Sequence, residues 1–292
     1  MRITENLLSE RYLYNQNRIN KKKLKIQSQL INNTKLETLS DNVGDSLEAI
    51  KLTSQIRKIE TFQKNIVSAK DYLNTAVNSL EIVSGETQKI IGQVMVADNE
   101  LNTANISTIA ISIKVSLSAI VDSLNEKKND MYVFGGTDYS EAPWKMDENG
   151  RAVRNSTNVT GEIKVQLTQS ITDTMNVTGN KIEETDLINT LNDLLDLLEA
   201  GNQPDKAIKD RLSDAYNSLI NLQSLNGDKL NRLDDINTLL EKQLIDSKEL
   251  IAKKQDIDPA KLIVDVQYQD YLLQMSYKLA ATILPKSLLD YL

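Results

Sequence analysis

The sequence predicts a mainly α fold: an elongated long-helix bundle, built as an antiparallel coiled-coil rod, with a small β-rich insert at the distal end. Two observations carry this prediction. Apolar residues recur every seven residues over long stretches on both sides of the middle of the chain, which is typical of helices that pack along their length. Only 10 glycines and 4 prolines occur in 292 residues, and 4% of the residues are aromatic. Folds with many turns between short strands need more glycine and proline than this.

Long helices are expected on either side of the insert. Residues 45–104 keep an apolar a/d seam, so we expect one bundle helix about 90 Å long at the usual rise per residue. A second helix over 105–129 should fold back on it. After the insert we expect helices over 184–199 and 205–254, the latter pairing antiparallel with the first. The seam residues of the first helix are Leu52, Ile59, Ile66, Leu73, Leu80, Val94 and Leu101.

The middle of the chain has a different pattern. Threonine, valine and alternating polarity over 137–183 indicate strands, with 162–168 as one strand and 147–151 as a hairpin turn. About 45 residues are too few for an independent core, so we expect the insert to lean on the helices. Gly135-Gly136 precedes it. We interpret this pair as a turn that needs a positive φ, because the lysine and hydroxyl residue of a phosphate loop are missing.

The terminal helices have thin apolar stripes. Residues 3–31 and the helix that follows Pro259 have wide polar faces, and such helices need a partner to be stable. Ser40-Asp41 is a plausible start signal for the helix after the first one. We expect the terminal stripes to pack between subunits. The predicted assembly residues are Ile3, Leu7, Leu13, Leu272, Met275, Leu279, Leu288, Leu289 and Leu292.

Charge and composition limit the function. The net charge is −7, but the charged side chains of residues 1–35 are mostly basic, eight basic against two acidic. No aromatic stacking platform or nucleic-acid motif accompanies them, so we interpret this helix as solvated or assembly-facing and expect no nucleic-acid partner. The chain lacks cysteine and histidine, which excludes disulfides, thiolate chemistry and the commonest general base. We therefore expect no enzyme, catalytic residue, metal site or cofactor.

The sequence also shows no pattern typical of a targeting signal. The first residues lack the apolar core of a cleavable signal peptide, so we expect either a cytoplasmic protein or export by a route without such a signal. No apolar run approaches the roughly 20 residues of a membrane span, so we expect no membrane insertion. The chain divides into an N-terminal assembly helix (1–44), two halves of the bundle (45–136 and 184–256), the insert (137–183) and a C-terminal assembly helix (257–292).

Four segments, in this order, resemble the bacterial flagellin superfamily. The chain opens on Met-Arg-Ile, and residues 39–49 stand where the family has a Ser-Asp-Asp-Pro turn, with Asn42 and Gly44 replacing its second Asp and its Pro. The stretch 132–144 resembles the Tyr-x-Phe-Gly-Gly…Pro-Phe signature of the hook-associated protein 3 family, which filament flagellin usually lacks. Residues 287–292 are similar to that family's Leu-Leu-Asn-Tyr-Leu ending. The signature residues are Tyr132, Phe134, Gly135, Gly136, Pro143 and Trp144.

This resemblance implies a flagellin-like structural subunit of the bacterial flagellum, an adaptor ring at the hook–filament junction. The implied partners are other copies of the chain, the preceding hook-associated junction protein, flagellin and an export chaperone. The resemblance also implies secretion through the flagellar type III channel, and terminal segments that are disordered in the monomer and pair into a coiled coil on assembly. The alternatives are a minor filament flagellin or, from a different class, a cytoplasmic coiled-coil scaffold or nucleoid-binding protein.

Overall fold

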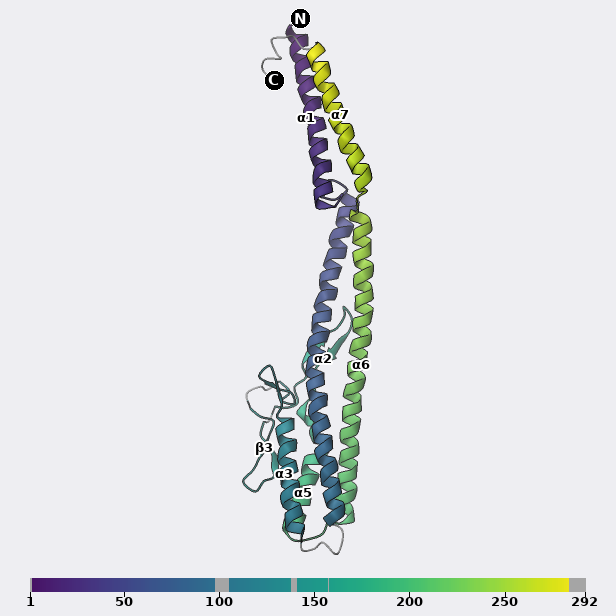
Figure 1. Cartoon of the computed structure of the whole chain (residues 1–292). Helices are drawn as coiled ribbons and strands as arrows, with labels where there is room; N and C mark the ends of the chain where they lie inside the picture. Colours follow the sequence, from purple (N-terminus) through teal and green to yellow (C-terminus); the bar gives the residue numbers. More distant parts are fainter. Residues whose placement is uncertain (1, 98–104, 138–140, 157, 284–292) are drawn as a thin grey trace. The chain divides into compact units, whose positions relative to one another are not determined.

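The computed structural model describes residues 2–97, 105–137, 141–156 and 158–283. The chain forms two compact units: unit 1 comprises residues 1–57 and 244–292, and unit 2 comprises residues 58–243. Two long helices, α2 (Val43–Ala97) and α6 (Lys206–Gln255), contribute to both units. The order of the elements is shown in Figure 1. The prediction of a mainly α fold with long helices is confirmed. Leu101, a predicted seam residue, lies outside the described residues.

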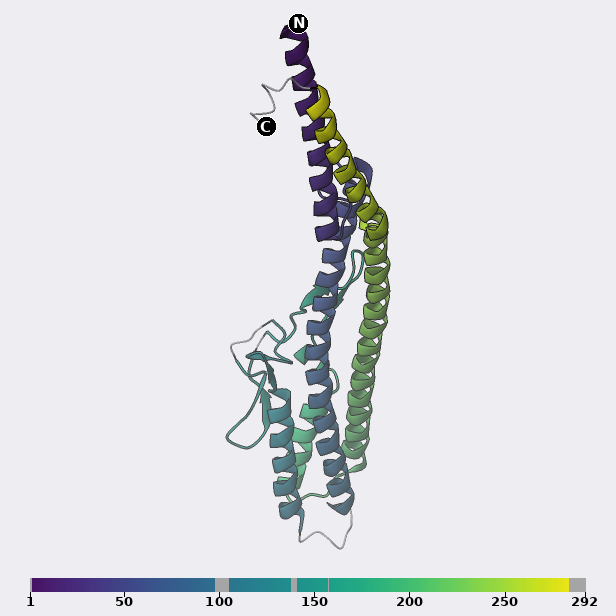
Figure 2. The same cartoon turned by 45° about the horizontal axis from the view of Figure 1, so that its top comes forward.

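In unit 1 the first and last helices pack on each other. α1 (Arg2–Asn32) and α7 (Pro259–Ile283) lie side by side (Figures 1 and 2). Ile26 of α1 and Leu273 of α7 are buried, and an ion pair joins Lys23 Nζ to Asp270 Oδ1 at 2.5 Å. A part of each thin stripe is thus buried within the chain.

The start of α2 is fixed by polar contacts within unit 1. Asn42 caps the helix, because its Oδ1 accepts a hydrogen bond from the Asp45 amide at 3.2 Å. Lys254, at the end of α6, pairs with Glu48 at 2.9 Å and with Asp45 at 3.0 Å. These two carboxylates raise the pKa of Lys254. The predicted start signal at Ser40-Asp41 is therefore two residues early, and Asn42 is the capping residue.

Asp41 organises the turn between α1 and α2. Its carboxylate accepts a hydrogen bond from Lys25 Nζ and from the backbone amides of Thr38 and Glu37, at 2.9 and 3.0 Å. The Lys25 ammonium first, and then the amide of Thr38, lowers the pKa of Asp41 from its usual 3.8 to about 2. The turn is therefore held by the ionised form of this side chain.

Unit 1 should accordingly lose stability in acid through Asp41. Because the folded state lowers the pKa of this carboxyl to about 2, its contribution is complete above the unfolded pKa near 3.8 and disappears as the pH falls towards 2. We expect Asp41→Asn to be less stable than the native chain at pH 6, with the difference shrinking between pH 4 and pH 2. Urea unfolding followed by circular dichroism across this range measures it. A difference that does not change with pH contradicts the assignment.

In unit 2 the long helices run antiparallel. Lys70 of α2 pairs with Asp234 of α6, and Gln88 Nε2 of α2 donates a hydrogen bond to the Tyr216 hydroxyl of α6 at 2.5 Å. Residue numbers rise along α2 as they fall along α6, so the predicted antiparallel pairing is confirmed. The core of this unit contains large side chains that are fully buried, among them Ile66, Leu73, Leu80, Ile90, Ile113, Leu117, Ile120 and Leu124.

Three shorter helices complete the helical part of unit 2 among the described residues. α3 (Ile106–Leu124) and α5 (Leu187–Glu199) pack on each other, and the one-turn α4 (Gly179–Glu183) precedes α5. Among the described helices, α3 alone is long and apolar enough to cross a membrane by length and composition. The expectation that no such run exists is therefore corrected. Half of its apolar window is buried inside the protein, which is the environment of a core helix.

In the described part of the β-rich region, the strands form three separate antiparallel hairpins. β1 (Lys127–Lys128) pairs with β2 (Met131–Tyr132), β3 (Trp144–Met146) with β4 (Ala152–Arg154), and β5 (Lys164–Gln166) with β6 (Thr172–Thr174). The predicted turn at 147–151 joins β3 to β4, and the predicted strand at 162–168 contains β5. The first strand of the first hairpin, β1, lies inside the expected helix 105–129. That helix ends at Leu124 because the Asn125 side chain exchanges two hydrogen bonds with the backbone of Trp144.

The hairpins lie along the side of the unit 2 helices (Figures 1 and 2). The sequence pattern instead predicts the β-rich insert at the distal end of the helices. Asn65 Nδ2, in α2, donates to the Gln166 carbonyl at 2.8 Å. Lys229 Nζ, in α6, donates to Thr174 Oγ1 at 2.9 Å. The reason is that α3 runs back along α2, so the segment that follows α3 returns to the middle of the helices.

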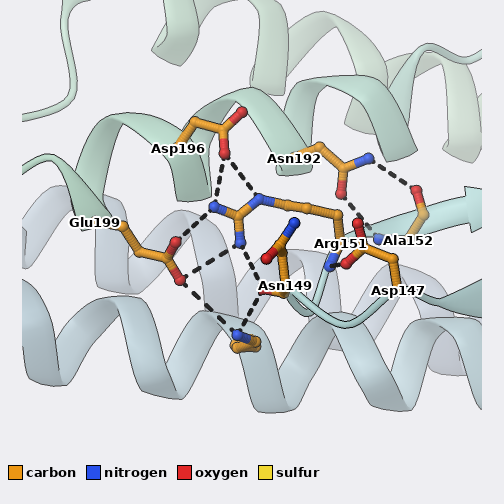
Figure 3. A network of polar contacts seen from close by, with 8 residues as sticks. Asp147, Asn149, Arg151, Ala152, Asn192, Asp196 and Glu199 are labelled. Carbon is orange, nitrogen blue, oxygen red and sulfur yellow. Dashed lines mark hydrogen bonds and ion pairs between the residues drawn. The ribbon is translucent and has the colours of Figure 1, made fainter.

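Arg151 fastens the second hairpin to α5, as Figure 3 shows. Its guanidinium, 11% exposed, lies 2.6 Å from Asp196 Oδ1 and 2.7 Å from Glu199 Oε2. The Glu199 carboxylate raises the pKa of Arg151, and Arg151 in turn lowers the pKa of Glu199. Asn192 accepts from the amide of Ala152 at 3.0 Å and donates to its carbonyl at 2.8 Å. These contacts hold a hairpin that is too short to be stable alone.

Candidate assembly surface

The face of α7 that points away from α1 carries a row of exposed apolar residues. Gln269, Leu273 and Ala280 are buried on the side of α1. The exposed apolar residues at positions 264, 268, 271, 275 and 279 are spaced by four, three, four and four residues, which places them on the opposite face of the helix. Exposed apolar patches of this kind mark interaction sites. We call this set the outer stripe: Val264 (62% exposed), Tyr268 (56%), Tyr271 (55%), Met275 (39%) and Leu279 (54%).

The predicted assembly residues fall in several environments. Met275 and Leu279 belong to the outer stripe, and Leu272 is half-buried beside it. Leu7 and Leu13 are exposed on α1. Ile3 belongs to α1, but its side chain lies outside the described part of the structure, as do Leu288, Leu289 and Leu292 entirely. The structure thus brings two of the predicted residues together.

Three members of the outer stripe, Val264, Tyr268 and Tyr271, were missing from the predicted assembly residues. The regular spacing could have found them, because positions 264, 268, 271 and 275 follow the i, i+4, i+7, i+11 pattern. The pattern does not reveal which of the two apolar faces of α7 packs on α1. That choice depends on tertiary contacts such as the burial of Leu273.

Most of the signature residues between 132 and 144 are buried in the interior of unit 2. Phe134 and Trp144 are fully buried, Gly135, Gly136 and Pro143 are buried, and Tyr132 is half-buried. Gly136 has φ +66°, and a Cβ there would lie 2.8 Å from the backbone carbon of Val159. This is the positive φ expected of the glycine pair, and only glycine adopts it without strain here.

A side chain of α2 forms hydrogen bonds with the same segment. The Tyr72 hydroxyl donates to the carbonyls of Tyr132 and Val133, both at 3.1 Å. The segment is therefore attached to α2 by hydrogen bonds as well as by packing. Within the described residues, no group of three or more Asp and Glu side chains could hold a metal ion.

No protein-family model matches the chain. No curated protein matches its sequence either. Solved structures do match. A protein described as flagellar hook-associated, from Vibrio parahaemolyticus, is 20% identical, with a TM-score of 0.65, and the match covers 74% of this chain and 100% of that one. FlgL of Bacillus cereus is also 20% identical, with a TM-score of 0.58 and coverage of 69% and 99%.

A third solved structure has a lower identity. The flagellar junction protein FlgL of Legionella pneumophila is 14% identical, with a TM-score of 0.58, and the match covers 72% of this chain and 100% of that one. At such identities the similarity establishes architecture. The chain has the fold of flagellar hook-associated and junction proteins.

Proposed function

We propose that the chain is a structural subunit of the bacterial flagellum, an adaptor ring that joins the hook to the filament. The observation that carries the proposal is the match to solved hook-associated and junction proteins over 99–100% of their own lengths. The signature at 132–144 favours the junction over the filament. The outer stripe of α7 suits the contact between subunits that a ring requires.

In this function the chain works mechanically. Residues 1–44 and 257–292 act as the assembly segments, and the bundle helices carry torque from the hook to the filament. The partners are further copies of the chain, the preceding hook-associated junction protein, flagellin and an export chaperone, and the chain leaves the cell through the flagellar type III channel. The protein has no catalytic role, in keeping with its lack of histidine and cysteine.

The structure gives little support to a nucleoid-binding scaffold. That alternative rests on the basic residues of α1, but two of them already have carboxylate partners within unit 1. Lys23 pairs with Asp270, and Lys25 pairs with Asp41. Phosphate binding at these two lysines would have to compete with the pairs, which counts against a nucleic-acid surface there.

Deleting the gene in its own bacterium tests the proposal. We expect electron microscopy to show intact hooks without filaments and unpolymerised flagellin in the medium, with the full chain restoring filaments. Shortened or thinned filaments on intact hooks would favour a minor flagellin instead. Normal filaments together with salt-sensitive DNA binding by the purified chain would favour the scaffold.

A further inference from the structure

A groove of about 470 Å³ runs along the first turns of α2 in unit 1. Residues from positions 46–57 of α2, which we call the groove floor, line it together with the turn that contains Leu39 and with Gln255 of α6. Leu39 and Ile50 line it with apolar side chains that are both 55% exposed. We call this hollow the α2 groove.

The α2 groove contains a polar atom without a partner. Ser46 is 8% exposed, and its hydroxyl oxygen is buried and makes no hydrogen bond to any described residue. Buried polar atoms are nearly always hydrogen-bonded in native proteins. An occupant of the groove should therefore offer apolar side chains together with a hydrogen-bonding group.

The outer stripe of α7 meets both requirements. Its residues 264, 268, 271 and 275 repeat the spacing of residues 46, 50, 53 and 57 on the groove floor, and both rows are about 16 Å long. Tyr268 and Tyr271 supply large apolar rings with a hydroxyl that both donates and accepts. The two surfaces thus match in length, spacing and chemistry.

The occupant has to come from another copy of the chain. In its own chain α7 packs on α1 through its opposite face, where Leu273 is buried, and no described residue of α7 lines the α2 groove. We propose that the outer stripe of one copy docks in the α2 groove of a second copy. This inference rests on the assembly role proposed above and names the surface that receives α7.

Charge selects the direction of docking. Arg57 lines the far end of the groove from Ser46, and Asp265 flanks the Val264 end of the outer stripe. Antiparallel docking brings Asp265 towards Arg57, and it brings Tyr271 towards Ile50, so that the tyrosine hydroxyl lies about one helical turn from Ser46. Complementary charges of this kind fix register and orientation. Because the two surfaces are different, each copy keeps one free surface of each kind, and the contact extends to further copies rather than closing a dimer.

Cysteine cross-linking tests the contact, because the chain has no cysteine of its own. Full-length Ser54→Cys and Tyr268→Cys chains carrying different tags are mixed under mild oxidation, at concentrations up to about 1 mM so that weak contacts are populated. Antiparallel docking brings these positions within disulfide range. The matched control is Tyr277→Cys, since Tyr277 is 52% exposed on the same helix but on another face. We expect about tenfold more mixed dimer with Tyr268→Cys than with this control.

A second pair of variants probes the groove floor. Ile50 and Leu47 are 55% and 56% exposed, and only Ile50 lines the groove. In the Ser54→Cys chain we expect Ile50→Asp to lower the yield of mixed dimer about tenfold and Leu47→Asp to change it less than twofold. Circular dichroism should show the same helix content for both variants.

The outcomes separate this inference from the proposed function. Equal yields for Tyr268→Cys and Tyr277→Cys, or equal losses for Ile50→Asp and Leu47→Asp, overturn the docking of α7 in the groove. If this occurs while the deleted strain has hooks without filaments, the flagellar role stands and α7 docks elsewhere. If the mixed chains cross-link with the expected selectivity but the deletion strain keeps its filaments, the junction role is overturned and the contact between copies stands.

Discussion

Phe134→Ala is expected to lower the free energy of unfolding of unit 2 by about 3–5 kcal/mol. The Phe134 side chain is fully buried in the signature segment, whose neighbour Val133 is also buried. Removing the ring loses its burial and leaves a cavity, because close-packed surroundings relax only in part. Trp144, the only tryptophan, is buried in the same unit. Its fluorescence in a urea titration therefore reports the unfolding of unit 2 itself.

The second phenylalanine provides the matched control. Phe62 lies in the unit 2 part of α2 and is half-buried, so Phe62→Ala should lose less than about half as much as Phe134→Ala. Following Trp144 matters here, because a chain with two units need not unfold in one step. Equal losses for the two variants would mean that Phe134 is no more important to packing than a partly exposed side chain.

The long helices were predictable because most of their seam residues are buried: of the described seam residues named for α2, all except the half-buried Leu52 are buried. The expected range 205–254 differs by one residue at each end from α6 (Lys206–Gln255), and the start expected at 45 differs by two from that of α2 (Val43–Ala97). Leu73 and Leu80, both predicted from periodicity to lie on the packed side of α2, are fully buried. A pattern repeated over many turns outweighs any single exception.

The insert was predictable only as a region. Each of its hairpins has strands of two or three residues, too short for a period of two to identify them. Their positions depend on contacts between distant residues, such as Asn125 with Trp144 and Arg151 with Asp196. A single sequence does not contain these pairings. The same applies to the candidate site: the periodicity of α7 indicates two apolar faces, and the contact with α1 decides which one is exposed.

The double variant Tyr268→Asp/Met275→Asp is expected to leave cells with hooks but without filaments. Both side chains are exposed in the single chain, so the variant should fold and be exported normally. Burying an unpaired carboxylate in an apolar contact costs about 3–5 kcal/mol, which lowers the association constant of each contact more than about a hundredfold. Motility assays and electron microscopy of the complemented deletion strain measure the loss. The presence of the variant in the culture medium shows that export is intact.

Tyr277→Asp separates this effect from a general effect of charge on α7. Tyr277 is 52% exposed, close to the 56% of Tyr268, but it lies about half a turn away around the helix. It therefore carries the same substitution on the same helix outside the outer stripe, and we expect cells with Tyr277→Asp to build filaments and swim normally. If Tyr277→Asp abolished filaments as well, the requirement would belong to the whole of α7. If the double variant swam normally, the outer stripe would not be an assembly surface, and the contacts between subunits would have to come from the exposed residues of α1, such as Leu7 and Leu13.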